Sequence, residues 1–107
     1  MFSCKITVLR KSLFHDLAAE YLNKDYQAIS YCDFFEEGQE FVIDPASVPN
    51  DFSNACPWAW ADIRKDILAI AYGGDIPGYR HKGITLSSCT DWFRPVLFKI
   101  ERIGNHR

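Results

Sequence analysis

The segment ACPWAWADIRKDILAIAYGGD, residues 55–75, decides the fold of this chain. Pro57 suits the first position of a helix, where its missing N–H costs nothing, so we expect Cys56 at the N-cap. Gly73 and Gly74 are typical of a helix end. The apolar residues between recur at the spacing of one helix face: Trp60, Ile63, Ile67, Ile70 and Ala71. The segment therefore predicts one amphipathic helix with an apolar side facing a core.

Four other segments have the composition of strands, namely residues 2–9, 40–44, 84–89 and 96–103. Alternating apolar residues give the first and last of them one buried face. These residues are Phe2, Cys4, Ile6 and Val8 in the first, and Val96, Phe98 and Ile100 in the last. The intervening TDWFRP predicts a hairpin-like loop between the last two strands.

The remaining segments are less regular. Residues 13–22 carry apolar side chains at helical spacing, and Ser12 can cap such a helix through its hydroxyl. Residues 26–35 are rich in aromatics and have no clear period. Residues 44–55, DPASVPNDFSNA, form the longest irregular stretch, which suits either a functional lid or a simple surface crossover.

The order β-α-β-α-β-β predicts an α+β fold, in which about two helices cover one face of a small mixed sheet. A chain of 107 residues is short enough for a single domain spanning residues 1–107, with 104–107 as a frayed tail. Such a domain has room for one core and one modest pocket.

Composition and charge exclude several classes of function. A net charge of −2 and a pI near 5.8 lack the basic face that nucleic-acid binding needs. No signal peptide and no run of about 20 apolar residues is visible, so we expect a cytoplasmic protein without a membrane partner. The phosphate-loop, H-E-x-x-H and G-x-S-x-G motifs are absent, and no cofactor is expected.

The four cysteines, Cys4, Cys32, Cys56 and Cys89, form no C-x-x-C pair, so most are expected to be small buried residues. Cys56 is the exception to consider, because the positive end of a helix stabilises a thiolate nucleophile. Burial as a simple cap is the alternative for Cys56. Together with His81, Cys32, Cys56 and Cys89 are an alternative zinc set or redox module.

Five segments in order, KITVLRK (5–11), FFEEGQEFVID (34–44), CPWAWADIRKDILAIAYGGD (56–75), CTD (89–91) and RPVLFKIERI (94–103), cover most of the chain. They resemble a family of small, single-domain, functionally uncharacterised microbial proteins. Its signature is F-E-E-G-Q-E-F, C-x-W-A-W-x-D-I, C-C-T-D-G and R-P-V-x-F-K-x-E-R-I. The resemblance implies shared residues rather than a reaction. The matching positions are Cys32, Glu36, Glu37, Gly38, Gln39, Cys56, Trp58, Trp60, Asp62, Cys89, Asp91 and Arg94.

Two departures from that signature bear on function. Ser88 stands where the family often has the first cysteine of a pair. Trp92 and Phe93 replace a small turn that begins with glycine. A bulky Trp92 could close over a pocket, which suits a large apolar ligand.

Carboxylates near indoles are the candidate proton-transfer groups. Asp62 follows the helix start and Asp91 lies in the hairpin loop, and burial against apolar surface makes a carboxyl group a usable acid or base. Asp62 could instead interact with the helix start, and Glu36 and Glu37 are weaker candidates in a turn. Arg94 could clamp a ligand carboxylate in a bidentate fork or pair with Asp91.

The leading hypothesis is a cofactor-independent isomerase, cyclase or lyase, or a binding protein, with an aromatic-lined pocket for an apolar small molecule. The expected catalytic residues are Asp62, Asp91 and Cys56, and the expected binding residues are Trp58, Trp60, Trp92, Phe93, Arg94 and Tyr79. This hypothesis needs the helix start and the hairpin tip to face one hollow. The alternatives are the cysteine-based metal or redox module and a homodimeric interaction domain without catalysis.

Overall fold

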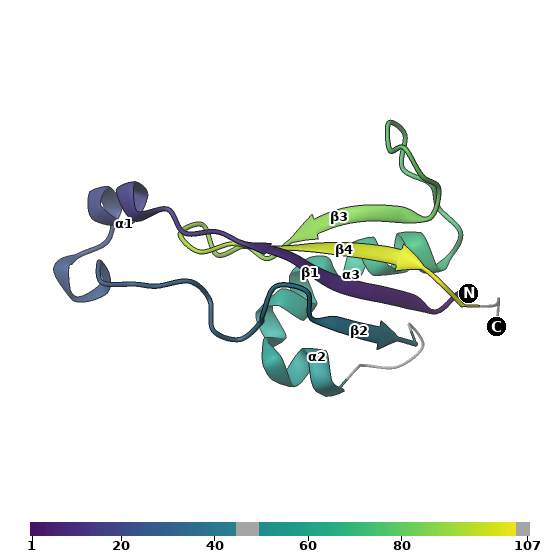
Figure 1. Ribbon diagram of the computed structural model, residues 1–107, viewed down its shortest axis with the longest axis horizontal. Coiled ribbons are helices and arrows are strands. Elements are labelled where there is room, and N and C mark those ends of the chain that lie inside the picture. The colour runs from purple at the N-terminus through teal and green to yellow at the C-terminus, as the bar shows by residue number, and fades with distance from the viewer. Residues whose placement is uncertain (45–49, 105–107) are drawn as a thin grey trace.

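Helices and strands follow one another as the α+β prediction requires (Figure 1). The computed structural model describes residues 1–44 and 50–104. The elements are β1 (Cys4–Lys11), α1 (His15–Tyr21), a 3₁₀ turn (Lys24–Tyr26), β2 (Glu40–Ile43), α2 (Asn50–Ala55), α3 (Pro57–Ala71), β3 (Ile84–Ser88) and β4 (Val96–Arg102). None of the described helices is both long and apolar enough to cross a membrane.

The four strands form one sheet in the order β2-β1-β4-β3. Every neighbouring pair is antiparallel, and Cys4 lies opposite Ile43 on one side and Arg102 on the other. The predicted mixed sheet is therefore antiparallel throughout. A parallel pair needs a crossover connection between its two strands. Here β3 and β4 are joined by a hairpin, and no connection between two neighbouring strands runs as such a crossover.

The core lies between one face of the sheet and the helices α2 and α3. Cys4, Ile6 and Val8 alternate into it from β1, as predicted. The predicted stripe of α3 is buried at Ile63, Ile67, Ile70 and Ala71, and Trp60 packs at its edge. A cluster of phenylalanine rings fills the centre, with neighbouring centroids 4.9–6.1 Å apart: Phe35, Phe41, Phe52 and Phe98.

The helices that cover the sheet differ from the prediction. α1 lies beyond the end of the sheet and buries only Ala18 (Figure 1). It starts after Phe14, two residues past Ser12, so the Ser12 hydroxyl does not cap it; the Ser12 backbone N–H donates to the Pro95 carbonyl. The covering role belongs to α2, inside the stretch predicted to be irregular, where Phe52 is fully buried.

Two parts of the sequence predictions fall on positions outside the described residues. They are the central part of the proposed lid, 45–49, and the last three residues of the proposed tail, 105–107. The described part of the lid segment, residues 50–55, is helical and its Phe52 contributes to the core. Gly104 is tied to the start of β1 because its N–H donates to the Ser3 carbonyl at 3.3 Å.

Candidate functional site

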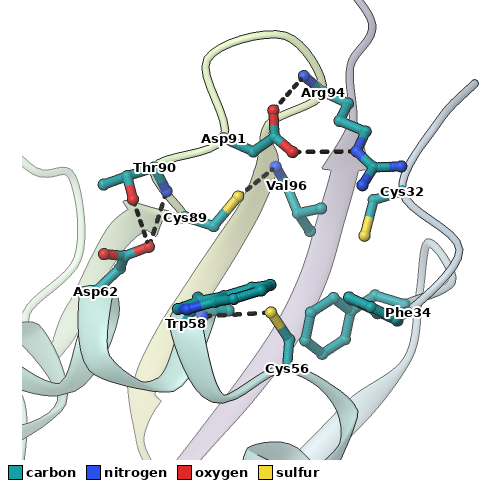
Figure 2. Close-up of a pocket in the computed structure, with 12 residues that line it drawn as sticks. Cys32, Phe34, Cys56, Trp58, Asp62, Cys89, Thr90, Asp91, Arg94 and Val96 are labelled. Carbon is teal, nitrogen blue, oxygen red and sulfur yellow. Dashed lines mark hydrogen bonds and ion pairs between the residues drawn. The ribbon is translucent and has the colours of Figure 1, made fainter. Parts of the chain in front are cut away.

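A pocket of about 250 Å³ lies between the first turns of α3, the β3–β4 hairpin and residues 32–35 (Figure 2). For comparison, an apolar cavity of about 150 Å³ admits benzene, and typical ligand pockets start near 300 Å³. The pocket therefore has room for one small molecule. Its lining consists of Cys32, Phe34, Phe35, Cys56, Trp58, Ala59, Asp62, Cys89, Thr90, Asp91, Arg94 and Val96.

The helix start and the hairpin thus face one hollow, as the sequence hypothesis requires. α3 begins at the end of the sheet where β3 finishes and β4 starts (Figure 1). Residues 32–35 join them because the Lys11 ammonium group donates to the Cys32 carbonyl at 3.0 Å. The following turn is pinned to β1 by the Gly38 N–H, which donates to the Val8 carbonyl at 2.7 Å.

The floor of the pocket is apolar, and two of its thiols are held in place by backbone N–H groups. Cys56 is the N-cap of α3, as predicted, and its Sγ accepts the Ala59 N–H at 3.4 Å. The Sγ of Cys89 accepts the Val96 N–H at 3.3 Å. Cys4 lies apart in the core, where burial raises the pKa of its thiol despite the opposing charge of Arg102.

Asp62 fastens the hairpin to α3 at the rim. One oxygen, Oδ2, accepts both the N–H and the hydroxyl of Thr90, at 2.8 and 2.9 Å. Its other oxygen has no hydrogen-bond donor among the residues that the structure describes. Asp62 therefore makes a structural contact at the pocket edge, and its second oxygen points away from the hollow (Figure 2).

Asp91 organises the hairpin turn. Its Oδ1 accepts the backbone N–H groups of Phe93 and Arg94, and its Oδ2 accepts the Arg94 Nε–H, all at 3.0 Å. Burial acts to raise the pKa of Asp91, but these hydrogen bonds and the Arg94 charge outweigh it, so the pKa is lowered. The expectation of a raised pKa is therefore wrong for Asp91. Its ionised carboxylate holds the Arg94 guanidinium.

Five residues predicted for binding or metal ligation lie outside the pocket lining: Trp60, Tyr79, His81, Trp92 and Phe93. Trp60 packs on Phe52 with ring centroids 6.2 Å apart. Trp92 is 71% exposed and does not close over the pocket. The Phe93 carbonyl accepts the Phe14 N–H, and the Tyr79 hydroxyl accepts a hydrogen bond at β3.

The alternative zinc set is not assembled. Cys32, Cys56 and Cys89 all line the pocket, but His81 is exposed in the connection from α3 to β3. Within residues 1–44 and 50–104, no group of three or more His, Cys, Asp or Glu side chains could hold a metal ion. All four cysteines are free thiols.

Phe34, Phe35 and Thr90 belong to the site but were not singled out from the sequence. The phenylalanine pair opens the segment FFEEGQEF, and its position just before the Gly38 turn was the available signal. The apolar residues of this segment do not alternate over enough positions to show which of the two rings is buried. Thr90 lies between two residues that were singled out, Cys89 and Asp91.

No protein-family model, curated protein or solved structure matches this chain. The family resemblance described above therefore stays a prediction.

Proposed function

We propose that this protein binds a small, largely apolar molecule in the pocket between α3 and the hairpin. The observation that carries the proposal is a concave, apolar floor bordered by a few polar groups, which is the usual composition of ligand sites. Phe35, Cys56 and Val96 supply the buried floor, and Phe34 and Trp58 stand at its sides. The polar groups at the rim are Asp62, Thr90, Asp91 and Arg94.

Trp58 and Trp92 provide a matched test of this proposal, because both are exposed and only Trp58 lines the pocket. Trp58→Ala is expected to weaken binding of small aromatic fragments about 10-fold or more, since an indole that a bound molecule covers is a typical energetic anchor. Trp92→Ala is expected to leave affinity within about 2-fold, since it touches no bound molecule. Titration calorimetry measures both; equal losses would contradict the assignment of this pocket.

Conversion of the ligand, in a cofactor-independent isomerase, cyclase or lyase reaction, is part of the same proposal. Asp62 is the better proton-transfer candidate, because Asp91 is fully engaged with the hairpin turn and Arg94. Cys56 is 8% exposed at the floor, so its sulfur meets only a molecule that has entered the pocket.

Asp62→Asn is expected to preserve ligand binding and to lower turnover by about 10²–10⁴-fold, the usual contribution of a general acid or base. An asparagine oxygen can still accept from Thr90, so the hairpin contact is kept. NMR spectra of each bound fragment, recorded over time, measure whether and how fast it is chemically converted. Unchanged turnover in the variant would remove Asp62 from the reaction, and the absence of any turnover in the wild type would leave a binding protein.

A second function, homodimer formation, is favoured by the arm, defined here as residues 12–31. It extends past the end of the sheet (Figure 1), and the radius of gyration is 15.2 Å, against about 13 Å for an average domain of this length. Phe14, Leu17 and Tyr21 are 40%, 40% and 73% exposed. A single helix of 7 residues is marginal by itself in water, so a second copy packed on α1 would stabilise it.

Light scattering after size exclusion is expected to give twice the chain mass at micromolar concentration. Leu17→Glu combined with Tyr21→Glu is expected to return the monomer, because charge is then placed in an apolar contact. Val42→Glu is the control, since Val42 is 66% exposed on β2, away from the arm. A specific weak dimer has a dissociation constant of roughly 100 micromolar at most. A wild-type protein that is still monomeric at that concentration would contradict homodimer formation.

A further inference from the structure

We infer that the ligand of the pocket carries a carboxylate group, which the two terminal nitrogens of Arg94 bind. This inference rests on the proposed binding function and names the class of molecule: a small apolar monocarboxylate. It follows from the way Arg94 is held, from the charges around the pocket and from the donors at the start of α3.

Among the described residues, the guanidinium of Arg94 is fixed through a single nitrogen. Its Nε donates to Asp91 Oδ2 at 3.0 Å, while Asp91 itself is fixed by two backbone N–H groups of the turn. The terminal nitrogens, Nη1 and Nη2, have no hydrogen bond or ion pair with any residue in the described parts of the chain. The group lies at the pocket edge beside Cys32 (Figure 2), so its open donors border the hollow.

Two parallel N–H donors on a planar cation match the two oxygens of a carboxylate. The Asp91 contact makes this match stronger, because it fixes the plane of the guanidinium before the ligand arrives. A neutral ligand without an acceptor would leave the terminal N–H groups of Arg94 with only water as a hydrogen-bond partner.

The other charges disfavour a doubly charged ligand. Arg94 is the one cationic side chain among the described residues that line the pocket, and it is already paired with Asp91, so a doubly charged phosphate would find too little compensation. Asp62 stands across the pocket from Arg94 (Figure 2), and one of its oxygens accepts two hydrogen bonds from Thr90.

The start of α3 leaves few donors for the anion. Pro57 has no N–H, and the Ala59 N–H already donates to the Cys56 sulfur, so Trp58 carries the remaining backbone N–H of these three residues. The apolar part of the ligand then lies over Cys56, between Phe34 and Trp58. A phenyl ring bearing a carboxylate is the simplest probe with both features.

The test titrates the full chain with benzoate, benzamide and inorganic phosphate, following amide resonances by NMR. Benzoate and benzamide have nearly the same shape and differ in charge. Benzoate is expected to bind about 10-fold more tightly than benzamide, because charge-assisted hydrogen bonds are roughly twice as strong as neutral ones. Phosphate is expected not to bind at the pocket.

Arg94→Gln is expected to remove the preference for benzoate while benzamide binds as before. Arg64→Gln is the matched control, because Arg64 is exposed on α3 and does not line the pocket. Asp91→Asn is expected to reduce the preference only in part, since Arg94 keeps its charge and loses its orientation. Thermal unfolding of each variant checks that the fold is intact.

The outcomes separate this inference from the proposed function. Equal binding of benzoate and benzamide at the pocket, or a preference that survives Arg94→Gln, overturns the carboxylate inference and leaves the binding function standing. Binding of phosphate in place of benzoate also overturns it. Both proposals fail if neither aromatic probe shifts the amide resonances of the pocket residues at 10 millimolar, which is roughly the weakest dissociation constant expected of a specific fragment.

Discussion

Phe35→Ala is expected to lower the free energy of unfolding by about 3–5 kcal/mol, the usual cost of removing a buried ring. Phe35 is 2% exposed and lies 5.2 Å from Phe98 and 5.3 Å from Phe52, measured between ring centroids. Alanine would leave a cavity at the junction of the sheet, α2 and the residue 32–35 segment. Because a domain is stable by only about 5–15 kcal/mol, this loss is a large part of the total.

The adjacent Phe34 is the matched control. It is 49% exposed and stands at the side of the pocket, so Phe34→Ala is expected to cost less than about 1 kcal/mol in stability. The Phe34→Ala substitution should instead weaken the binding of aromatic ligands. Urea unfolding of both variants makes the comparison, and similar losses of stability would contradict the placement of Phe35 in the buried core and of Phe34 at the exposed side of the pocket.

Arg102→Met has the second largest expected effect, a loss of about 2–3 kcal/mol, because it removes charged hydrogen bonds from carbonyl groups. Arg102 is 17% exposed at the end of β4. Its Nη1 donates to the carbonyls of Ile70 and Gly74 at 2.8 and 3.0 Å, and so satisfies the C-terminal end of α3. Its Nη2 pairs with Asp75 Oδ1 at 2.9 Å.

Arg102→Lys is expected to recover only part of this loss, because one ammonium group cannot reach three acceptors as a planar fork does. Arg10→Met is the control, since Arg10 is exposed on β1. Denaturant unfolding measures all three variants. If Arg102→Met matched the control, the bridge between β4 and the end of α3 would have no role in stability.

The Arg102–Asp75 pair also predicts a pH dependence. The Arg102 hydrogen bond, followed by the Gly83 N–H, lowers the pKa of Asp75 below its ordinary value of 3.8. A carboxyl group with a lowered pKa in the folded state contributes stability that is present above the unfolded pKa and lost as the pH falls through the folded pKa. The difference in stability between the wild type and Arg102→Met should therefore narrow between pH 5 and pH 2, as unfolding curves at each pH would show. A constant difference contradicts the pairing.

The sequence predicted best where local pattern and tertiary packing agree. α3 is an example, because the Pro57 start, the glycine end and the buried isoleucine stripe are all present as expected. The alternation of β1 and β4 also predicted their buried faces. These segments carry enough apolar residues to fix their own orientation.

The prediction failed where packing depends on distant partners. Residues 13–22 have a helical pattern, but the sheet face they would cover is already filled by α2, so α1 is short and exposed. Phe52 stands alone among small polar residues, and no period could identify it as core. Strand direction likewise depends on how the connections run, which local residues do not specify.

The candidate site followed the same division. The pocket brings together Cys56, Trp58 and Asp62 from α3 with Asp91 and Arg94 from the hairpin, and all five were candidates from the sequence. The large side chains Trp92 and Tyr79 were included for their size, but their orientations depend on the turn and on β3. Residue type indicates what a side chain can bind, whereas its place in the fold decides whether a ligand meets it.

The most direct test of the binding site is a map of amide shifts in ¹H–¹⁵N NMR spectra as a small aromatic carboxylate is added. The predicted result is a set of saturable shifts at Ala59, Thr90 and Val96, which line the pocket from α3, from the β3–β4 hairpin and from the start of β4. The amide of Gly83, beside Asp75 at the other end of α3, is expected to stay unchanged. Shifts confined to the open hollow at Lys11, Tyr31 and Glu37, or no saturable shifts at all, would contradict the account.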